Sequence, residues 1–192
     1  LTFALQALGS AAVLQPMLKL YHEGRIPSEQ DAAVLNLIAT LGGPNELGML
    51  LDVVEKKDGL STARRTALLE ALVRTTRERK VVPSGDLARL GGLIGDSDPG
   101  LRTAAVAAAG AWKVAALKPR LLEGATTVDA PGPLRMEAIR GLIAFGDPDS
   151  SATVAKLADS SNDPIGQALA LTALAANGPA AVADRTARWL AG

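Results

Sequence analysis

The 192-residue sequence contains no cysteine and a single histidine, His22. Without thiols the chain cannot form a disulfide, a cysteine-ligated zinc site or a C-x-x-C-H haem attachment. With one histidine and no cysteine, the usual nucleophile and base pairs of catalytic sites cannot be assembled. A metal would need further ligands beside His22, whose place at an expected helix end instead complements the helix dipole. We therefore predict no catalytic, cofactor-binding or metal-binding residues.

Aromatic residues make up only 3% of the sequence, and the formal net charge is zero. A neutral chain has no overall field to concentrate DNA, RNA or anionic lipid, and few aromatic side chains are available to stack on bases. No stretch approaches 18 apolar residues without a charge or a helix breaker. We therefore expect neither a nucleic-acid partner nor membrane insertion.

Apolar helix-forming residues are what the sequence has in abundance. Hydrophobic residues make up 48% of it. The commonest residues, Ala and Leu, favour helices, whereas the β-branched and aromatic residues that favour strands are sparse. The composition predicts an all-helical protein.

Short turns that follow apolar helical stretches recur about every 33 residues, which is typical of a repeat architecture. These turns are centred on Gly9, Gly42, Lys113, Gly146 and Gly178. The double interval between Gly42 and Lys113 holds two units, with the missing turn expected near Thr75 or Thr76. We predict a single repeat domain over residues 1–192, with units of approximately 1–27, 28–60, 61–97, 98–130, 131–162 and 163–192.

Each unit contains two helical stretches. Asp98-Pro99 and Asp163-Pro164 place a capping side chain before a proline at the first helical position, and Ser28 is the expected cap of a helix over 29–41. The second helices are expected at about 45–55, 85–95, 115–123, 150–159 and 180–190. One helix pair buries too little apolar surface to be stable alone, so neighbouring pairs must stack. This predicts a right-handed α-solenoid of about six helical hairpins.

Two sequence patterns carry a resemblance to a known family. Asp98-Pro99-x-x-Arg102-x-x-Ala105 and the weaker Pro133-Leu134-Arg135-x-x-Ala138 resemble the HEAT repeat of the bacterial HEAT-like class. The resemblance implies a HEAT/armadillo-like superhelix in which arginines bond to aspartates in the turns between repeats. The residues of that structural ladder would be Asp98, Arg102, Arg135 and Asp147.

Three runs, 85–90, 96–102 and 109–113, are similar to the HEAT segment of large multidomain proteins of planctomycete-type bacteria. In those proteins a sorbosone/glucose-dehydrogenase-like β-propeller precedes the solenoid and a cytochrome c-type haem domain follows it. The sequence begins at Leu1 and not at an initiator Met, and its first residues show no basic n-region of a signal peptide, so we expect a segment of a longer protein. The resemblance implies a segment that links those two domains in the periplasm or cell envelope, with all catalytic and haem-binding residues outside it.

Other local features favour structural interpretations. Asp96-Ser97-Asp98 and Asp147-Pro148-Asp149 look at first like calcium loops, but Ala107 stands where an EF-hand-like loop from Asp96 needs a bidentate Glu. Both clusters precede helices, where carboxylates act as caps. The glycine-rich stretch 91–95 matches no phosphate-binding fingerprint and is expected to be a helix end and turn.

The strongest local charge is the basic cluster, which we define as Arg74, Arg77, Arg79 and Lys80. With the upstream pair Arg64-Arg65, it favours a solvated face or a docking surface over a nucleic-acid site. Trp112 aligns with core-type positions and is expected to be buried. Trp189, in the last expected helix, is a candidate docking residue because Trp is enriched at protein interfaces.

The predicted function is a non-catalytic helical-repeat scaffold that contacts proteins or neighbouring domains of the same chain. Its second helices would line the binding ridge. The alternative is a HEAT-fold enzyme that resembles the alkylpurine DNA glycosylases or the phycobilin lyases. Glycosylases of that kind use a basic, aromatic-lined groove, which a neutral chain with 3% aromatic residues lacks. A lyase would need a cavity that holds a tetrapyrrole.

Overall fold

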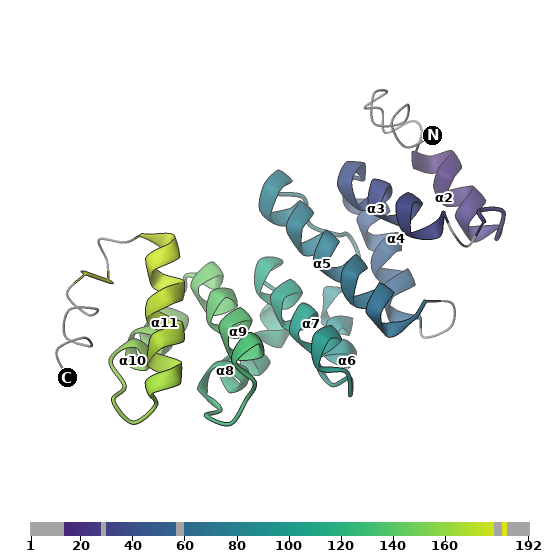
Figure 1. The fold of residues 1–192 in the computed structure, drawn as a ribbon. Helices are drawn as coiled ribbons and strands as arrows, with labels where there is room; N and C mark the ends of the chain where they lie inside the picture. The colour runs from purple at the N-terminus through teal and green to yellow at the C-terminus, as the bar shows by residue number, and fades with distance from the viewer. Residues whose placement is uncertain (1–13, 28–29, 57–59, 179–181, 184–192) are drawn as a thin grey trace. The chain divides into compact units, whose positions relative to one another are not determined.

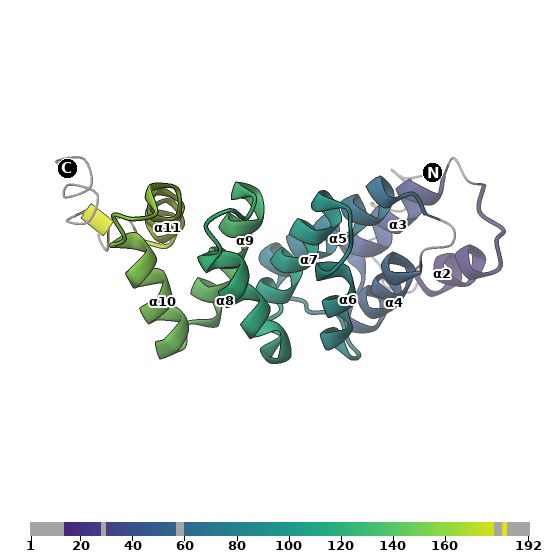
Figure 2. The ribbon, with the colours of Figure 1, turned by 90° about the horizontal axis from the view of Figure 1, so that it is seen from below.

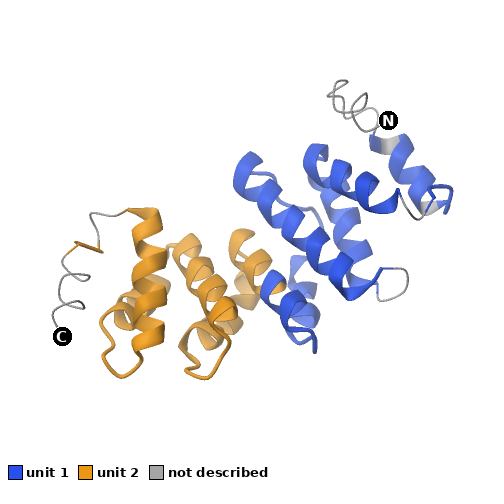
Figure 3. Cartoon of the chain, in the orientation of Figure 1, with its two compact units in different colours: residues 1–104 blue, residues 105–192 orange. Residues whose placement is uncertain are grey.

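The computed structural model describes residues 14–27, 30–56, 60–178 and 182–183, and every regular element among them is helical (Figure 1). The chain divides into two compact units, residues 1–104 and 105–192 (Figure 3). The α-helices are α2 Leu14–His22, α3 Asp31–Leu41, α4 Pro44–Glu55, α5 Thr62–Arg79, α6 Leu90–Ile94, α7 Pro99–Ala111, α8 Lys118–Thr126, α9 Gly132–Phe145, α10 Pro148–Ala158 and α11 Pro164–Asn177. Two 3-10 turns, η2 Leu87–Arg89 and η3 Ala115–Leu117, lead into α6 and α8.

In the first unit, α3 and α5 pack side by side and α4 packs against both of them. Leucine and isoleucine side chains fill the space between these helices, and the fully buried ones include Ile38, Leu47, Leu50, Leu51, Leu69 and Leu72. Gly48 of α4 is buried against the loop that precedes η2, because a Cβ there would lie 2.7 Å from the carbonyl oxygen of Ser84. The chain therefore needs glycine at this contact.

In the second unit, α9 and α11 form one layer, and α8 and α10 form the other (Figure 2). Apolar residues from both layers are buried between them, among them Leu121, Ala138, Ile139, Leu142 and Ala170. Among the described helices of this unit, α9 and the following α10 pack on each other as the two helices of one hairpin. The all-helical α-solenoid expected from the sequence is confirmed.

The expected helix starts use their acidic residues as caps. The Asp147 side chain accepts a hydrogen bond from the Ser150 N–H (3.0 Å), and the Asp163 side chain accepts one from the Gly166 N–H (2.9 Å). A proline follows each aspartate at the first helical position, where its missing N–H leaves no bond unmade. The helix expected after Ser28 begins at Asp31, and Ser28 itself lies outside the described residues.

The turn expected near Thr75 or Thr76 is wrong, because α5 continues to Arg79. Both threonines are buried inside this helix, and the Thr75 hydroxyl donates to the carbonyl oxygen of Ala39 in α3 (2.8 Å). No glycine or proline interrupts α5. The helix ends where Lys80 adopts a left-handed conformation with φ of 59°, a common helix ending.

The second helices predicted at 45–55, 115–123 and 150–159 correspond to α4, η3 with α8, and α10. The one predicted at 85–95 is the short η2 and α6, and the one at 180–190 falls almost wholly outside the described residues. Among the helices that the structure describes, none combines the length and hydropathy of a transmembrane span.

Candidate functional site

The fourth residue of several first helices bonds to the end of the second helix that precedes it. These residues are Arg65 in α5, Arg135 in α9 and Gln167 in α11. The hydrogen bonds run from Arg65 Nε to Val54 O (2.6 Å), from Arg135 Nε to Ala125 O (3.4 Å) and from Gln167 Nε2 to Ala158 O (3.2 Å). In these three cases the same helix position joins a hairpin to the one before it.

The chemistry of helix ends explains this choice of residues. The last carbonyl groups of a helix have no partner within the helix, and their combined dipole attracts positive charge. A long side chain that donates hydrogen bonds can satisfy such a carbonyl from the neighbouring helix. Arginine donates the hydrogen bond from a charged guanidinium group, and glutamine donates it from a neutral amide group.

Arg135 is fully buried, and its charge is balanced by Asp163, which is 8% exposed. Arg135 Nη1 donates to Asp163 Oδ1 (3.2 Å), and Nη2 donates to Oδ2 of the same carboxylate. Arg135 Nη1 also reaches the carbonyl oxygen of Val128 (3.3 Å). The guanidinium holds the pKa of Asp163 below its ordinary value, and the Gly166 N–H acts in the same direction. This is a bidentate ion pair, a geometry in which both charges stay hydrogen-bonded when they are buried.

The structure places Asp163, and not the expected Asp147, against Arg135. Asp147 precedes α10, which is the second helix of its hairpin. Asp163 precedes α11, which is the first helix of the next hairpin and packs on α9. Asp147 instead forms an ion pair with Lys118 of α8 (2.6 Å). The hydrogen bond from Lys118, aided by those from Ser150, holds the pKa of Asp147 far below its usual range.

The second expected rung consists of Asp98 and Arg102. The Asp98 carboxylate accepts a hydrogen bond from the Leu101 N–H (2.8 Å) and so caps α7. Arg102 is the fourth residue of α7, but its buried Nε finds no hydrogen-bond partner in the described part of the chain. The structure therefore places the four ladder residues at helix starts without joining Asp98 to Arg102 or Asp147 to Arg135.

The basic cluster lies at the exposed end of α5. Arg79 Nη1 donates to the carbonyl oxygens of Thr40 and Gly42 (3.0 Å for Gly42), which lie at the end of α3. Lys80 Nζ donates to the carbonyl oxygen of Arg77 (2.9 Å). Two of the four cations thus serve helix ends, and a docking role for the cluster stays a prediction.

Of the two tryptophans, Trp112 is only 6% exposed, and its expected burial is confirmed. Trp189 lies outside the described residues. His22 is the last residue of α2. The Asp96 carboxylate accepts a hydrogen bond from the Asp98 N–H (3.1 Å), which is a turn contact. Across the described ranges, no three acidic or histidine side chains are grouped so that they could hold a metal ion.

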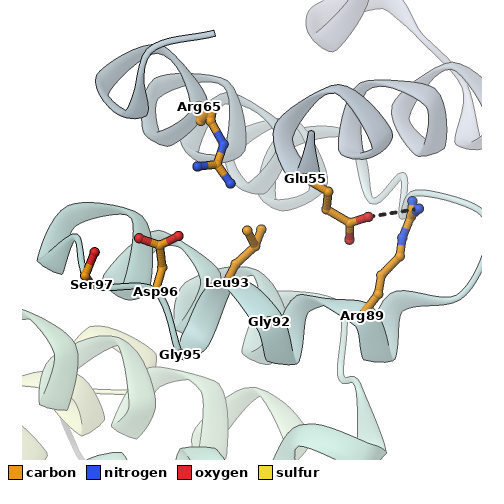
Figure 4. A pocket seen from close by; sticks show the side chains of 8 residues that line it. All are labelled: Glu55, Arg65, Arg89, Gly92, Leu93, Gly95, Asp96 and Ser97. Carbon is orange, nitrogen blue, oxygen red and sulfur yellow. Dashed lines mark ion pairs between the residues drawn. The ribbon is translucent and has the colours of Figure 1, made fainter. Parts of the chain in front are cut away.

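A cavity of about 470 Å³ opens in the first unit where α4, α5 and α6 meet (Figure 4). Its lining comes from the end of α4, the start of α5, η2, α6 and the turn before α7, and consists of Glu55, Arg65, Arg89, Gly92, Leu93, Gly95, Asp96 and Ser97. Figure 4 shows the Arg65 guanidinium pointing into this space above Leu93.

Three polar atoms of the lining residues are buried without a hydrogen-bond partner in the described part of the chain. They are Arg65 Nη2, Arg89 Nε and Glu55 Oε1. Other atoms of these side chains are engaged: Arg89 Nη1 forms ion pairs with Glu55 (3.2 Å) and with Asp52, and Arg65 Nε donates to Val54 O. Buried polar groups nearly always have hydrogen-bond partners in folded proteins. Three exceptions around one cavity therefore make it a candidate binding site.

The surroundings of the Glu55 carboxyl raise its pKa. Burial raises its pKa above the ordinary value, and the guanidinium of Arg89 opposes that increase. Repulsion from Asp52 and Asp86 raises the pKa further. A carboxyl with a raised pKa is less fully compensated than an ordinary surface carboxylate and would gain from an additional hydrogen-bond donor.

Sequence reasoning missed this cavity because its residues come from several separate segments. Arg65 was assigned to a surface charge pair, since no Asp-Pro signature precedes it. A usable signal was present, however: Ser61 caps α5, and Arg65 follows at the same helix position that Arg102 and Arg135 occupy in their own helices.

Residues 87–175 match the family model for HEAT repeats. The match runs from the start of η2 into α11 and supports the expected HEAT-like repeat protein. No curated protein and no solved structure matches the chain.

Proposed function

We propose that the chain is a non-catalytic scaffold that holds proteins, or neighbouring domains of its own polypeptide, against the surface of its second helices. HEAT repeats are typical of protein-interaction scaffolds, because stacked helix pairs present extended surfaces for binding. The observation that carries the proposal is the recurrent bond from the fourth residue of a first helix to the preceding second helix. That bond fixes neighbouring hairpins in register and so supports a firm binding surface.

The second helices carry side chains suited to a partner. Met49 of α4 is 38% exposed, so a large apolar side chain on this second helix is open to solvent. Methionine is enriched in protein interfaces and adapts its shape to a partner. On α10, Lys156 is exposed and adds a polar contact of the kind found at interface rims.

Site-specific photocrosslinking tests this surface. A photoreactive residue is placed at Met49 or Lys156, and matched controls carry it at Ala67 of α5 or Arg140 of α9, which are exposed on first helices. Within each unit, we expect a partner to be captured from the second-helix position and not from the first-helix control. Equal capture from first and second helices would contradict the proposed surface.

The proposed partners include the two flanking domains that the planctomycete-type resemblance implies. In that arrangement the scaffold links a dehydrogenase-like propeller to a cytochrome c-type domain. Sequencing the gene on both sides of these residues tests it, because a propeller upstream and a C-x-x-C-H motif downstream are expected. Other flanking domains would contradict the electron-transfer role but would not contradict the scaffold proposal.

A further inference from the structure

Arg65 and Arg135 occupy the same position in α5 and α9 and bond to the preceding helix in the same way, yet the terminal nitrogens of their guanidinium groups differ in their hydrogen bonds. Asp163 neutralises Arg135 through both terminal nitrogens. Arg65 is 4% exposed, and its Nη2 has no hydrogen-bond partner among the described residues. The Arg65 guanidinium faces the cavity, whose lining also includes the Asp96 carboxylate (Figure 4).

A buried guanidinium nitrogen without a hydrogen-bond partner is costly, because the interior does not replace the hydration that the group loses. Folded proteins keep such groups where a ligand supplies the missing partner or where catalysis uses the charge. The cavity of about 470 Å³ is within the size range of small-ligand sites. Its open space lies next to the unsatisfied guanidinium nitrogen, so an occupant can reach the charge.

The three unsatisfied atoms define what the occupant must carry. Arg65 Nη2 and Arg89 Nε are hydrogen-bond donors, and Glu55 Oε1 is an acceptor. A ligand therefore needs acceptor oxygens next to an N–H group. We propose that the cavity binds a terminal carboxylate flanked by an N–H group, with the carboxylate against Arg65 in the place that Asp163 takes beside Arg135, and the N–H against Glu55.

The charge of the lining argues for a carboxylate over a phosphate. Glu55 and Asp96 both line the cavity, and two nearby acidic side chains oppose a doubly charged anion more strongly than a singly charged one. A carboxylate also matches the planar, two-pronged geometry of a guanidinium. The required group occurs in a free amino acid and at the C-terminus of a peptide. This site goes beyond the scaffold function and does not depend on it.

Titration of the ¹⁵N-labelled chain, followed by amide NMR, tests the site. The probes are acetyl-Gly-Gly, its C-terminal amide, free glycine and inorganic phosphate. We expect acetyl-Gly-Gly to shift the resonances of Gly92, Leu93 and Gly95 saturably, with a Kd on the order of 1 mM. The amide and phosphate should bind at least about tenfold more weakly, because neither presents a single negative charge on planar paired oxygens.

Comparison of the two carboxylates identifies the source. Tighter binding of acetyl-Gly-Gly assigns the cavity to a chain terminus, and tighter binding of glycine assigns it to a free amino acid. The absence of a saturable shift with either carboxylate, or equal binding of the amide, would overturn the proposal. Both comparisons use the unaltered protein, so they do not depend on the folding of a variant.

Arg65→Gln provides the matched variant. Gln167 shows that glutamine at this helix position still bonds to the preceding helix end, so the variant keeps that contact and loses the charge. We expect it to keep its helical circular dichroism and to bind acetyl-Gly-Gly about tenfold more weakly or worse. Arg64→Gln makes the same change at the adjacent, exposed residue of α5, which does not line the cavity, and should leave binding unaltered. Unchanged binding by Arg65→Gln would overturn the role of the guanidinium.

Discussion

At the scale of single residues, Arg135 illustrates how this chain accommodates a buried charge. Its guanidinium donates to a helix-end carbonyl, to a loop carbonyl and to the Asp163 carboxylate. Asp163 in turn accepts from the Gly166 N–H. Each group supports the position of the next, so the network holds α8, α9 and α11 together. Networks of this kind are stabilising when every member is satisfied and costly when one is lost.

Gly166→Ala is predicted to destabilise the protein because its Cβ would lie within the Arg135–Asp163 network, 2.7 Å from Cγ of Asp163. Overpacking of this kind costs about 1–3 kcal/mol. Chemical denaturation measures the free energy of unfolding. Gly132→Ala is the control, because nothing lies within 4 Å of a Cβ at Gly132, at the start of α9. Similar unfolding energies for the two variants would contradict the prediction.

Asp163→Asn is predicted to change how stability depends on pH. The pKa of Asp163 is lowered in the folded state, so its ionised form favours folding. That contribution is complete above the ordinary carboxyl pKa of about 3.9 and is lost as the pH falls through the folded-state value. The wild-type protein should therefore be more stable than Asp163→Asn at pH 7, and the difference should shrink below about pH 4.

Urea denaturation at several pH values measures that difference. Asp149→Asn is the control, because Asp149 is an exposed residue in the first turn of α10 and lacks the Arg135 contact. A gap between wild type and Asp163→Asn that stays constant across the acid range would show that the carboxylate charge is not what stabilises the fold.

The site could be predicted from the sequence only where a local motif marked it. Arg135 was identified because a Pro-x-Arg pattern precedes a helical run. Its partner was misassigned, since Asp147 and Asp163 are both capping aspartates and only the stacking of α11 on α9 distinguishes them. Gln167 and Arg65 were missed because their role comes from helix position and not from residue type. The cavity depends on three-dimensional packing that no local pattern encodes.

At the scale of helices, close packing in the second unit depends on two glycines. A Cβ added at Gly141 of α9 would lie 3.0 Å from the Cα of Gly110 in α7 and would also strike Leu121. A Cβ at Gly110 would collide with the backbone of Gly141. The two helices can approach this closely because neither has a side chain at the crossing point.

Gly110→Ala and Gly141→Ala are each predicted to destabilise the protein by about 1–3 kcal/mol, because the helix backbones must separate. Alanine is otherwise the better helix former by about 1 kcal/mol, so a loss of stability reports the packing contact. Gly92→Ala in α6 is the control, since nothing lies within 4 Å of a Cβ there, and it should be neutral or stabilising. Stabilisation by either test variant would disprove the close contact.

Helix existence could be predicted well from the sequence, and helix ends less well. Asp-Pro pairs located the starts of α7 and α11, because capping and the fixed φ of proline are local effects. The end of α5 was misplaced since Lys80, and not glycine, adopts the left-handed ending. The 3-10 turns before α6 and α8 were not separated from those helices, because a 3-10 turn differs from an α-helix in backbone geometry and not in composition.

At the scale of the whole molecule, the described helices contact mainly their neighbours along the chain. In the second unit α8 packs on α9, α9 on α11 and α10 on α11, and in the first unit α3 packs on α4 and α5. Such local contacts are characteristic of repeat arrays, whose stability is a sum of terms for each repeat and its immediate neighbours. A local change should therefore have a local effect.

Native-state hydrogen exchange of Gly166→Ala tests this locality. The substitution disturbs the Arg135–Asp163 network, so amide exchange in α9 and α11 should accelerate relative to wild type. Exchange in α3 and α5 should be unchanged, because those helices lie in the other compact unit and pack mainly on α2 and α4 of that unit and on each other. Gly132→Ala, treated in parallel, should accelerate neither set. Equal acceleration in both units would show that the chain opens as one cooperative body, and the nearest-neighbour account of its stability would then be wrong.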